Sequence, residues 1–317
     1  MSTRPGGFAL DEGSIDEPWI HGHRRGMADA DPALQVRRLD ADTFVLRQSK
    51  SRTFEAPFLH LLLGGDRALL LDTGAVKDEA DCPVREAVEA LVTGWLDGRP
   101  RDGYELVVAH THAHGDHRAG DGQFTDRPGT RVVGSDLGSV RAEFGLEDWP
   151  AQVAAYDLGG RVLEVTGIPG HHATSIAVHD PTTGLLHTGD TVYPGRIYVE
   201  DPEALLDTLD RLVAFAEDRG VRHVLGCHVE MTSTPGRDHP LGSRYQPDEP
   251  SPFMTVAQLR AVRDTFRAVA RRPGIHRFDD VVFCVGEGPR VVVPLQSRAL
   301  LEQLRWRLGL LRRRPGT

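Results

Sequence analysis

Four histidines and one aspartate fall within eight consecutive residues of this sequence, His110-Thr111-His112-Ala113-His114-Gly115-Asp116-His117. The whole chain of 317 residues holds 15 histidines, so the local density is far from an even distribution. Neutral imidazole and carboxylate are common ligands of zinc and of similar divalent ions. Gly115 leaves the backbone free to curl, so side chains two residues apart can converge on one point. The segment therefore predicts a metal site rather than a polar turn with incidental histidines.

Three further candidate ligands follow predicted strands later in the chain. His171 comes after a strand predicted over 161–168, Asp190 after one over 185–188, and His228 after one over 221–226. Taken alone, each is more typical of a loop residue or of a core residue with satisfied hydrogen bonds. Because a single cluster at one strand end cannot fill two coordination spheres, we interpret these three residues as the missing ligands.

The elements that position these residues follow from hydrophobic periodicity and turn residues. The first half predicts strands at 43–47, 58–63, 68–72 and 104–109, a hairpin across 64–66 and a helix at 83–96. The second half predicts strands at 161–168, 175–179, 185–188, 221–226, 281–285 and 290–293, and helices at 202–218, at 255–270 and from Ser297. Two β-rich halves that both contain helices favour a sheet-on-sheet core covered by helices.

The chain divides into three predicted segments. Residues 1–35 lack a sustained apolar period and are interpreted as an N-terminal arm, in part disordered. Residues 36–311 form the predicted catalytic domain. Residues 312–317 form a basic tail that begins with three consecutive arginines.

Composition narrows the possible partners and the cellular location. The formal net charge of −9 argues against a nucleic-acid partner, because such binding depends on clustered cations. No run of about 18 apolar residues is present and the N-terminus lacks the apolar core of a signal peptide, so we expect a cytoplasmic protein without a membrane partner. Three scattered cysteines do not suggest a disulfide framework. A small-molecule substrate is the expected partner, and the oligomeric state is left open.

The motif His112-x-His114-x-Asp116-His117 resembles the defining motif of the metallo-β-lactamase superfamily. Later in the chain, Gly170-His171, Gly189-Asp190 and His228 match that superfamily's further motifs in order and approximate spacing. The resemblance covers about residues 36–228. It implies an α+β fold, a four-layer αβ/βα sandwich that holds its metals at one edge of the two sheets.

The resemblance also implies how the ligands are shared between two ions. One ion is held by His112, His114 and His171, and the other by Asp116, His117 and His228, with Asp190 bridging both. Two Zn²⁺ are expected, with iron or manganese as the alternatives. His110 lies outside the motif and is interpreted as a supporting or structural residue.

Two divalent ions lower the pKa of a shared water, so a metal-bridging hydroxide can attack a carbonyl or phosphoryl centre near neutral pH. Asp116 is expected to orient this nucleophile as well as to bind metal. Tyr193 stands three residues after Asp190, and its phenol is a candidate hydrogen-bond donor to the substrate. A similar Asp-x-x-Tyr arrangement occurs in the superfamily's lactonases. An equally weighted alternative makes Tyr193 a packing residue that caps the loop.

The branch of the superfamily is narrowed by its motifs. A bridging aspartate is absent from true β-lactamases, which places this chain nearer to lactonases, thioesterases and phosphodiesterases. We therefore expect a hydrolase (EC 3) that attacks an ester, lactone or thioester carbonyl. The alternatives are a phosphodiesterase and an iron-dependent oxidoreductase with the same ligands. A glutathione-thioester hydrolase of the glyoxalase II type stays open, although the sequence shows no basic C-terminal patch for glutathione.

Two segments that follow proposed ligands are expected to form the walls of the substrate pocket. These segments, 193–200 and 229–252, combine aromatic, charged, proline and glycine residues. In the alternative interpretation they only cover the edge of the domain, with Asp248 and Glu249 pairing the arginines internally. The predicted substrate-binding residues are Tyr193, Arg196, Tyr198, Arg244 and Tyr245.

Overall fold

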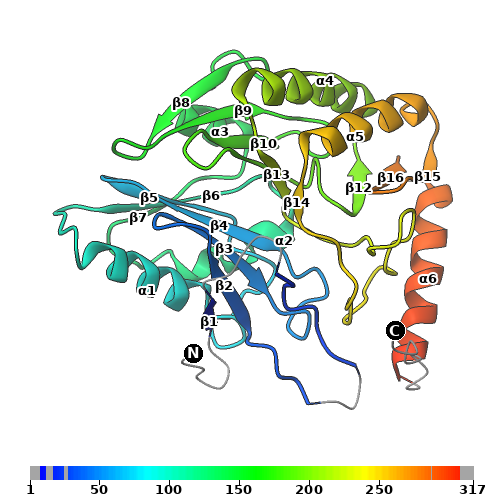
Figure 1. Cartoon of the computed structure of the whole chain (residues 1–317), viewed down its shortest axis with the longest axis horizontal. Coiled ribbons are helices and arrows are strands. Elements are labelled where there is room, and N and C mark those ends of the chain that lie inside the picture. Colours follow the sequence, from blue (N-terminus) through cyan, green and yellow to red (C-terminus); the bar gives the residue numbers. More distant parts are fainter. Residues whose placement is uncertain (1–7, 12–16, 25–27, 287, 308–317) are drawn as a thin grey trace.

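The computed structural model describes residues 8–11, 17–24, 28–286 and 288–307. Two large β-sheets pack face to face, and helices cover their outer faces (Figure 1). The first sheet is mixed, with the order β1-β2-β3-β4-β5-β6-β7. Its strands are Phe8–Asp11 (β1), Leu34–Arg38 (β2), Thr43–Gln48 (β3), Phe58–Leu63 (β4), Arg67–Leu71 (β5), Glu105–Ala109 (β6) and Thr130–Val132 (β7).

The second sheet has the order β14-β13-β11-β10-β9-β8, and a small third sheet has the order β12-β16-β15. The second sheet contains Val153–Asp157 (β8), Val162–Gly167 (β9), Ile176–Asp180 (β10), Leu185–Gly189 (β11), His223–Gly226 (β13) and Phe253–Met254 (β14). The third contains Arg196–Val199 (β12), Gly274–Arg277 (β15) and Val282–Val285 (β16).

Alternation of side chains along the strands creates the four layers. In β5, Leu70 packs toward the helix Val84–Leu96 (α1), whereas Leu69 and Leu71 face the second sheet. In β11, Leu186 packs toward the helices Pro202–Arg219 (α4) and Val256–Val269 (α5) on the other outer face. The strand β4 is buried along its whole length, as expected for a strand covered on both faces. This is the predicted αβ/βα sandwich.

The covering helices begin at clear local signals. Asp201 caps α4 by accepting hydrogen bonds from the backbone N–H groups of Glu203 and Ala204, and Pro202 takes the first helical position. Gly220 ends the helix at φ 64° in the left-handed region. Thr255 and Gln258 form a reciprocal capping box at the start of α5. Three shorter helical segments are Gly115–Arg118 (α2), Ala119–Gln123 (η1, a 3₁₀ turn) and Leu137–Phe144 (α3).

The predicted strand at 290–293 is wrong. These residues belong to the helix Pro289–Arg307 (α6), which begins eight residues before the predicted start at Ser297. The run Val291-Val292-Val293 favours a strand locally, but Val291 and Leu295 are four residues apart and are both buried in one cluster. Tertiary packing along a helical face therefore overrides the β-propensity of this run.

The predicted arm and tail are only partly described. Within the arm, β1 pairs in parallel with β2, and Trp19 packs edge-on against Phe58 with ring centroids 5.0 Å apart. The boundaries at residues 35 and 311 stay predictions, and the tail 312–317 lies outside the described residues. In the portion of the chain that the structure describes, no helix is both long and apolar enough to cross a membrane.

Candidate metal centre and active site

Strand ends at one edge of the sandwich bring the predicted ligands together. The segment after β6 leads into α2, which carries Asp116 and His117. Asp190 directly follows β11, and Cys227 alone separates His228 from the end of β13. His171 is reached from β9 through Gly170, whose φ of 132° and contact with α4 leave no room for a side chain. Ligands from both sheets therefore meet at the same edge.

The first cluster contains three imidazoles. His112 Nε2 lies 3.0 Å from His114 Nδ1 and 3.2 Å from His171 Nε2. His171 Nε2 and His114 Nδ1 are 3.1 Å apart. Ligands of a tetrahedral zinc ion are separated by roughly 3.3–3.4 Å, given Zn–N bonds of about 2.0–2.1 Å. The three nitrogen atoms are therefore spaced as ligands of one ion.

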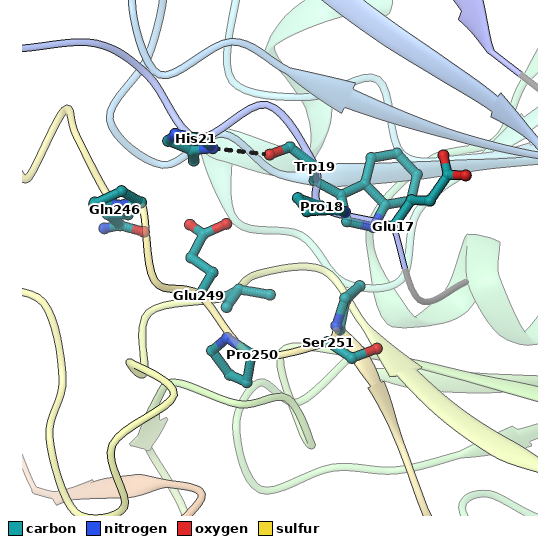
Figure 2. Close-up of a pocket in the computed structure, with 11 residues that line it drawn as sticks. Glu17, Pro18, Trp19, His21, Gln246, Glu249, Pro250 and Ser251 are labelled. Carbon is teal, nitrogen blue, oxygen red and sulfur yellow. Dashed lines mark hydrogen bonds between the residues drawn. The ribbon is translucent and has the colours of Figure 1, made fainter. Parts of the chain in front are cut away.

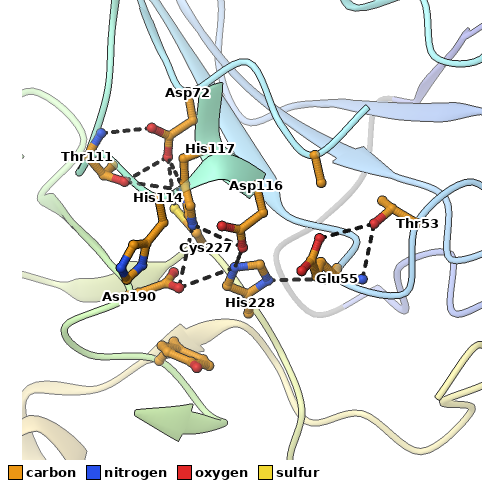
Figure 3. Close-up of polar contacts among 12 residues, drawn as sticks. Thr53, Glu55, Asp72, Thr111, His114, Asp116, His117, Asp190, Cys227 and His228 are labelled. Carbon is orange, nitrogen blue, oxygen red and sulfur yellow. Dashed lines mark hydrogen bonds and ion pairs between the residues drawn. The ribbon is translucent and has the colours of Figure 1, made fainter. Parts of the chain in front are cut away.

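The second cluster combines imidazole and carboxylate (Figure 3). His228 Nε2 lies 3.4 Å from Asp116 Oδ2 and 3.4 Å from Asp190 Oδ2. His117 Nε2 lies 3.6 Å from Asp116 Oδ2 and 3.5 Å from Asp190 Oδ2. Asp190 Oδ2 is also 3.9 Å from His171 Nε2 in the first cluster. This oxygen faces both groups of nitrogen atoms, so all seven predicted ligands surround one centre.

The opposite nitrogen of each ring is held by another part of the chain. His171 Nδ1 donates to the backbone carbonyl of Tyr198 at 2.7 Å. His228 Nδ1 donates to that of Glu55 at 3.1 Å. The remaining three contacts join His112 Nδ1 to Thr111 Oγ1 at 3.2 Å, His117 Nδ1 to Asp72 Oδ2 at 2.9 Å and His114 Nε2 to Glu200 Oε1 at 3.2 Å. Such partners fix the tautomer and orientation of metal-binding histidines.

These outer contacts show that a metal ion fits the site. In the first cluster each ring proton is used outward, so the inward nitrogens of His112, His114 and His171 present lone pairs to one another. Lone pairs at these separations repel unless a cation lies between them. His117 Nε2 and Asp190 Oδ1 are buried atoms without a hydrogen-bond partner. The donor set, mostly nitrogen with two carboxylates, suits Zn²⁺.

The pKa shifts separate the two clusters. Burial, reinforced by the neighbouring His117, holds the pKa of His112 well below its usual range, and burial lowers the pKa of His171 to about 4. Burial acts in the same direction on His228, but Asp190 and Asp116 outweigh it and raise its pKa to about 10. Against the effect of burial, His228 and His117 hold the pKa of Asp190 well below its usual range. The carboxylate-rich cluster therefore favours a bound positive charge.

Comparison with known proteins decides the family. The family profile described as the metallo-beta-lactamase superfamily matches residues 56–242, more than half of the chain. The chain belongs to the metallo-β-lactamase superfamily. A metallo-beta-lactamase from Pontibacter korlensis has the same fold, with a TM-score of 0.50 and 20% identity over 74% of this chain and 99% of that chain.

Curated relatives in the superfamily carry the name hydroxyacylglutathione hydrolase. One from Synechococcus is 31% identical over 64% of this chain and 75% of its own length. One from Chromohalobacter salexigens is 30% identical over 64% of this chain and 78% of its own length. One from Rhizobium meliloti is 27% identical over 40% of this chain, and the match spans only half of its length. The superfamily and these relatives indicate a hydrolase.

A cavity of about 270 Å³ opens over the metal centre of this superfamily member. Its lining includes metal ligands together with Phe54, Glu55, Tyr193, Tyr198, Glu230 and Leu241. The predicted wall segments 193–200 and 229–252 thus both contribute to it. Sequence reasoning missed Phe54 and Glu55, which lie on the loop between β3 and β4. Their position before β4, at the same sheet edge as the ligands, is the signal that points to them.

Three predicted substrate-binding residues have other surroundings. Among the described residues, the cavity lining does not include Arg196, Arg244 or Tyr245. Arg196 is buried and pairs with Glu230 and with Asp238, the latter at 3.1 Å. It is therefore a structural support behind the cavity wall rather than a free cation. Arg244 donates to the backbone carbonyl of Ser51 at 2.9 Å. Tyr245 lies against the arm, 5.9 Å between ring centroids from His21.

The two predicted tyrosines line the cavity, but the hydroxyl of Tyr193 is engaged. It donates to the backbone carbonyl of Arg196 and lies 3.4 Å from Glu230 Oε2. These contacts favour the packing alternative for its phenol, while its ring stays beside His228 at 5.6 Å between centroids. His110, also outside the ligand set, lies behind the centre at 3.2 Å from Asp121 Oδ2.

A second cavity of about 200 Å³ lies between the arm and the segment 229–252 (Figure 2). Its lining includes Trp19, Pro250 and Glu249, and Figure 2 shows the carboxylate of Glu249 between the arm and Gln246. Glu249 accepts two hydrogen bonds from the guanidinium of Arg47, at 2.5 and 2.8 Å. Glu249 is thus paired internally, but with Arg47 instead of with the predicted Arg196 or Arg244. The second cavity contains no predicted ligand.

Proposed function

We propose that this protein is a dinuclear metal-dependent hydrolase that cleaves esters, lactones or thioesters by attack of an activated water on the carbonyl carbon. The observation that carries the proposal is the position of Asp190 Oδ2. On one side it lies 3.5 Å from His117 Nε2 and 3.4 Å from His228 Nε2, and on the other 3.9 Å from His171 Nε2. One carboxylate oxygen that faces both clusters suits a bridged pair of ions about 3.5 Å apart. Zn²⁺ is the proposed ion for both positions.

Bound at these positions, the two ions supply an activated water and polarise the substrate carbonyl. The chain contributes the remaining steps. Asp190 fixes the relative position of the two clusters. Asp116 lines the cavity beside His117 and His228, and its carboxylate orients the attacking water and accepts its proton. Phe54 and Leu241 supply apolar walls against which the acyl group packs.

The curated relatives support the thioester branch, since a hydroxyacylglutathione is a thioester of glutathione. The relatives' names do not determine the substrate of this chain, because the match leaves out half of the Rhizobium meliloti protein and about a quarter of the other two. The described cavity lining also contains carboxylates and no arginine or lysine, whereas the carboxylates of glutathione require cationic partners. The proposed reaction is hydrolysis at an ester, lactone or thioester carbonyl, with Asp116 as the proton acceptor.

The proposal is tested by loading the full chain with Zn²⁺ and screening chromogenic esters, lactones, thioesters, phosphodiesters and a cephalosporin. Turnover of a carbonyl substrate that disappears after chelation and returns with two equivalents of Zn²⁺ is the expected result. Elemental analysis of protein purified without added metal identifies the native ion. Hydrolysis of phosphodiesters alone, or a native iron centre without hydrolase activity, contradicts the proposal.

A further inference from the structure

The cavity over the metal centre has a charge pattern that the hydrolytic reaction alone does not require. Besides the metal ligands, its lining contains three aromatic residues, Phe54, Tyr193 and Tyr198, and two carboxylates, Glu55 and Glu230. Within the described part of the chain, no arginine or lysine lines it. Metal ions neutralise Asp116 and Asp190 when they bind, but they do not contact the other two carboxylates in the arrangement proposed above.

The two remaining carboxylates differ in how their charge is compensated. Glu230 is neutralised by Arg196, whose guanidinium donates to Oε1 and whose backbone N–H donates to Oε2 at 2.7 Å. Glu55 Oε2 accepts only a long hydrogen bond from the hydroxyl of Thr53, at 3.4 Å (Figure 3). Among the described residues, no arginine or lysine forms an ion pair with Glu55. Within the described part of the lining, Glu55 is thus the non-ligand carboxylate that has no arginine partner.

Resting on the proposed hydrolase function, we propose that the substrate carries an alkylammonium group and that Glu55 recognises it. A carboxylate in a cavity that is also lined by aromatic rings attracts such a cation through charge, and the ring quadrupoles favour the same charge. An anionic group at the same place meets an unneutralised carboxylate, which disfavours it. This substrate class differs from the anionic glutathione conjugates that name the relatives.

The position of Glu55 sets the length of the substrate. Its backbone carbonyl accepts the hydrogen bond of His228 Nδ1 at 3.1 Å. Glu55 is therefore in direct contact with a candidate metal ligand. The reacting carbonyl lies at the metal centre, and the ammonium lies beside Glu55. A short spacer therefore separates the two groups, as in an acylated amino alcohol or amino thiol.

Two thiols of nearly equal shape and a smaller anionic thiol test the charge preference without requiring turnover. Thiocholine is cationic, 3,3-dimethylbutane-1-thiol is its neutral carbon analogue, and 3-mercaptopropionate is a shorter anion. Each is titrated into the Co²⁺-loaded full chain, because thiolate coordination changes the visible absorption of cobalt. We expect thiocholine to bind roughly tenfold more tightly than the neutral thiol, and the anion to bind most weakly, on the scale of one part-buried ion pair.

The same comparison is made with the S-acetyl derivatives of the three thiols on the Zn²⁺-loaded chain. The ratio of kcat/KM between the cationic and the neutral substrate is expected to be about tenfold higher in the wild type than in Glu55→Gln, a comparison that cancels the difference in leaving group. Glu79→Gln, a change at an exposed glutamate outside the cavity lining, should leave the ratio at its wild-type value.

Equal binding of the three thiols, or tightest binding of the anion, overturns the charge inference even if carbonyl substrates are hydrolysed. A cation preference that survives in Glu55→Gln also overturns it, because the recognising group is then another residue. Ordered binding that collapses in Glu55→Gln supports the inference. If no carbonyl substrate is hydrolysed while the binding order holds, the proposed reaction fails and the charge preference stands.

Discussion

The two halves of the metal centre use the same side chain in opposite electrostatic surroundings. The inward nitrogens of His112, His114 and His171 face one another, while Glu200 contacts only the outer nitrogen of His114, and burial lowers the pKa of His171 to about 4. Against the effect of burial, Asp190 and Asp116 raise the pKa of His228, in the other half, to about 10. The first half offers neutral lone pairs, whereas the second offers negative charge.

In the proposed dinuclear site, this contrast means that the two ions are held for different reasons. In the first half, retention of metal depends on the orientation of three rings. In the second, it depends on the charge of Asp116 and Asp190. Substitutions that remove a negative charge should therefore weaken metal binding mainly in the second half. Substitutions that remove the hydrogen-bond partner of a histidine should weaken metal binding in the half that contains this histidine.

The largest effect is expected for Asp190→Asn, because this carboxylate faces both halves. The amide keeps the shape but loses the charge, so both ions should bind more weakly and kcat/KM should fall by about a thousandfold or more. Metal content after gel filtration measures the loss. Asp116→Asn is the matched change in the second half, and it should retain close to one equivalent of metal. Full occupancy in Asp190→Asn would contradict a bridging role.

A selective loss of the second ion is expected for Asp72→Asn. Asp72 accepts the ring proton of His117 at 2.9 Å and has a left-handed φ of 69°, which asparagine tolerates. The fold should therefore persist while the affinity for the second ion falls by about 10–100-fold, the usual effect of losing such a partner. Competition with a zinc chelator resolves two dissociation constants. Equal weakening of both constants would show that the halves are not separable in this way.

A smaller effect, confined to the first ion, is expected for Glu200→Gln. The carboxylate of Glu200 lies 3.2 Å from His114 Nε2 and is 42% exposed, so solvent screens the contact. The affinity for the first ion should fall by roughly tenfold or less, with a larger loss in Glu200→Ala. Glu203→Gln, an exposed neighbour at the start of α4, serves as the control. Identical chelator curves for all three variants and the wild type would exclude a role for Glu200.

The smallest effect is a pH dependence of the metal-free protein. Buried neutral histidines such as His171 bind fewer protons in the folded chain than in the unfolded chain, so stability falls as pH drops from about 6.5 toward about 4. His228 has the opposite sign: its contribution is fully present below about 6.5 and is lost as pH rises through about 10. The melting temperature should therefore be highest near pH 6–7.

Asp190→Asn provides the control for this profile. After burial, which acts in the opposite direction, Asp190 is the largest influence on the pKa of His228. The variant should therefore lose much of the alkaline decline and keep the acid decline. A wild-type melting temperature that does not change between pH 7 and pH 10 would refute the alkaline branch. Thermal scans of chelator-treated protein make both measurements.

Much of the fold was predictable because its signals are local. The strand at 58–63 and the helix at 202–218 agree with β4 and α4 within one residue, since a short apolar run, a capping Asp201 and a terminal Gly220 all act within a few residues. The strand predicted at 290–293 failed, because valine favours strands locally and only the packing of Val291 and Leu295 shows the helix. The small third sheet was also unpredictable as a unit, since β12 pairs with a strand far along the chain.

The amino-acid sequence by itself determined the cluster at 110–117 and the three later candidates His171, Asp190 and His228, because residue type, density and position at strand ends are readable without contacts. The resemblance to the superfamily motif then reduced these candidates to seven. Only the tertiary structure decided which side chains hydrogen-bond to those ligands and which arginines form internal ion pairs. Asp72 and Glu200 reach their histidines across 45 and 86 residues of sequence, and Arg196 meets Glu230 across 34. Such contacts follow from how the two sheets pack, and burial then determines which charges must be paired inside the protein.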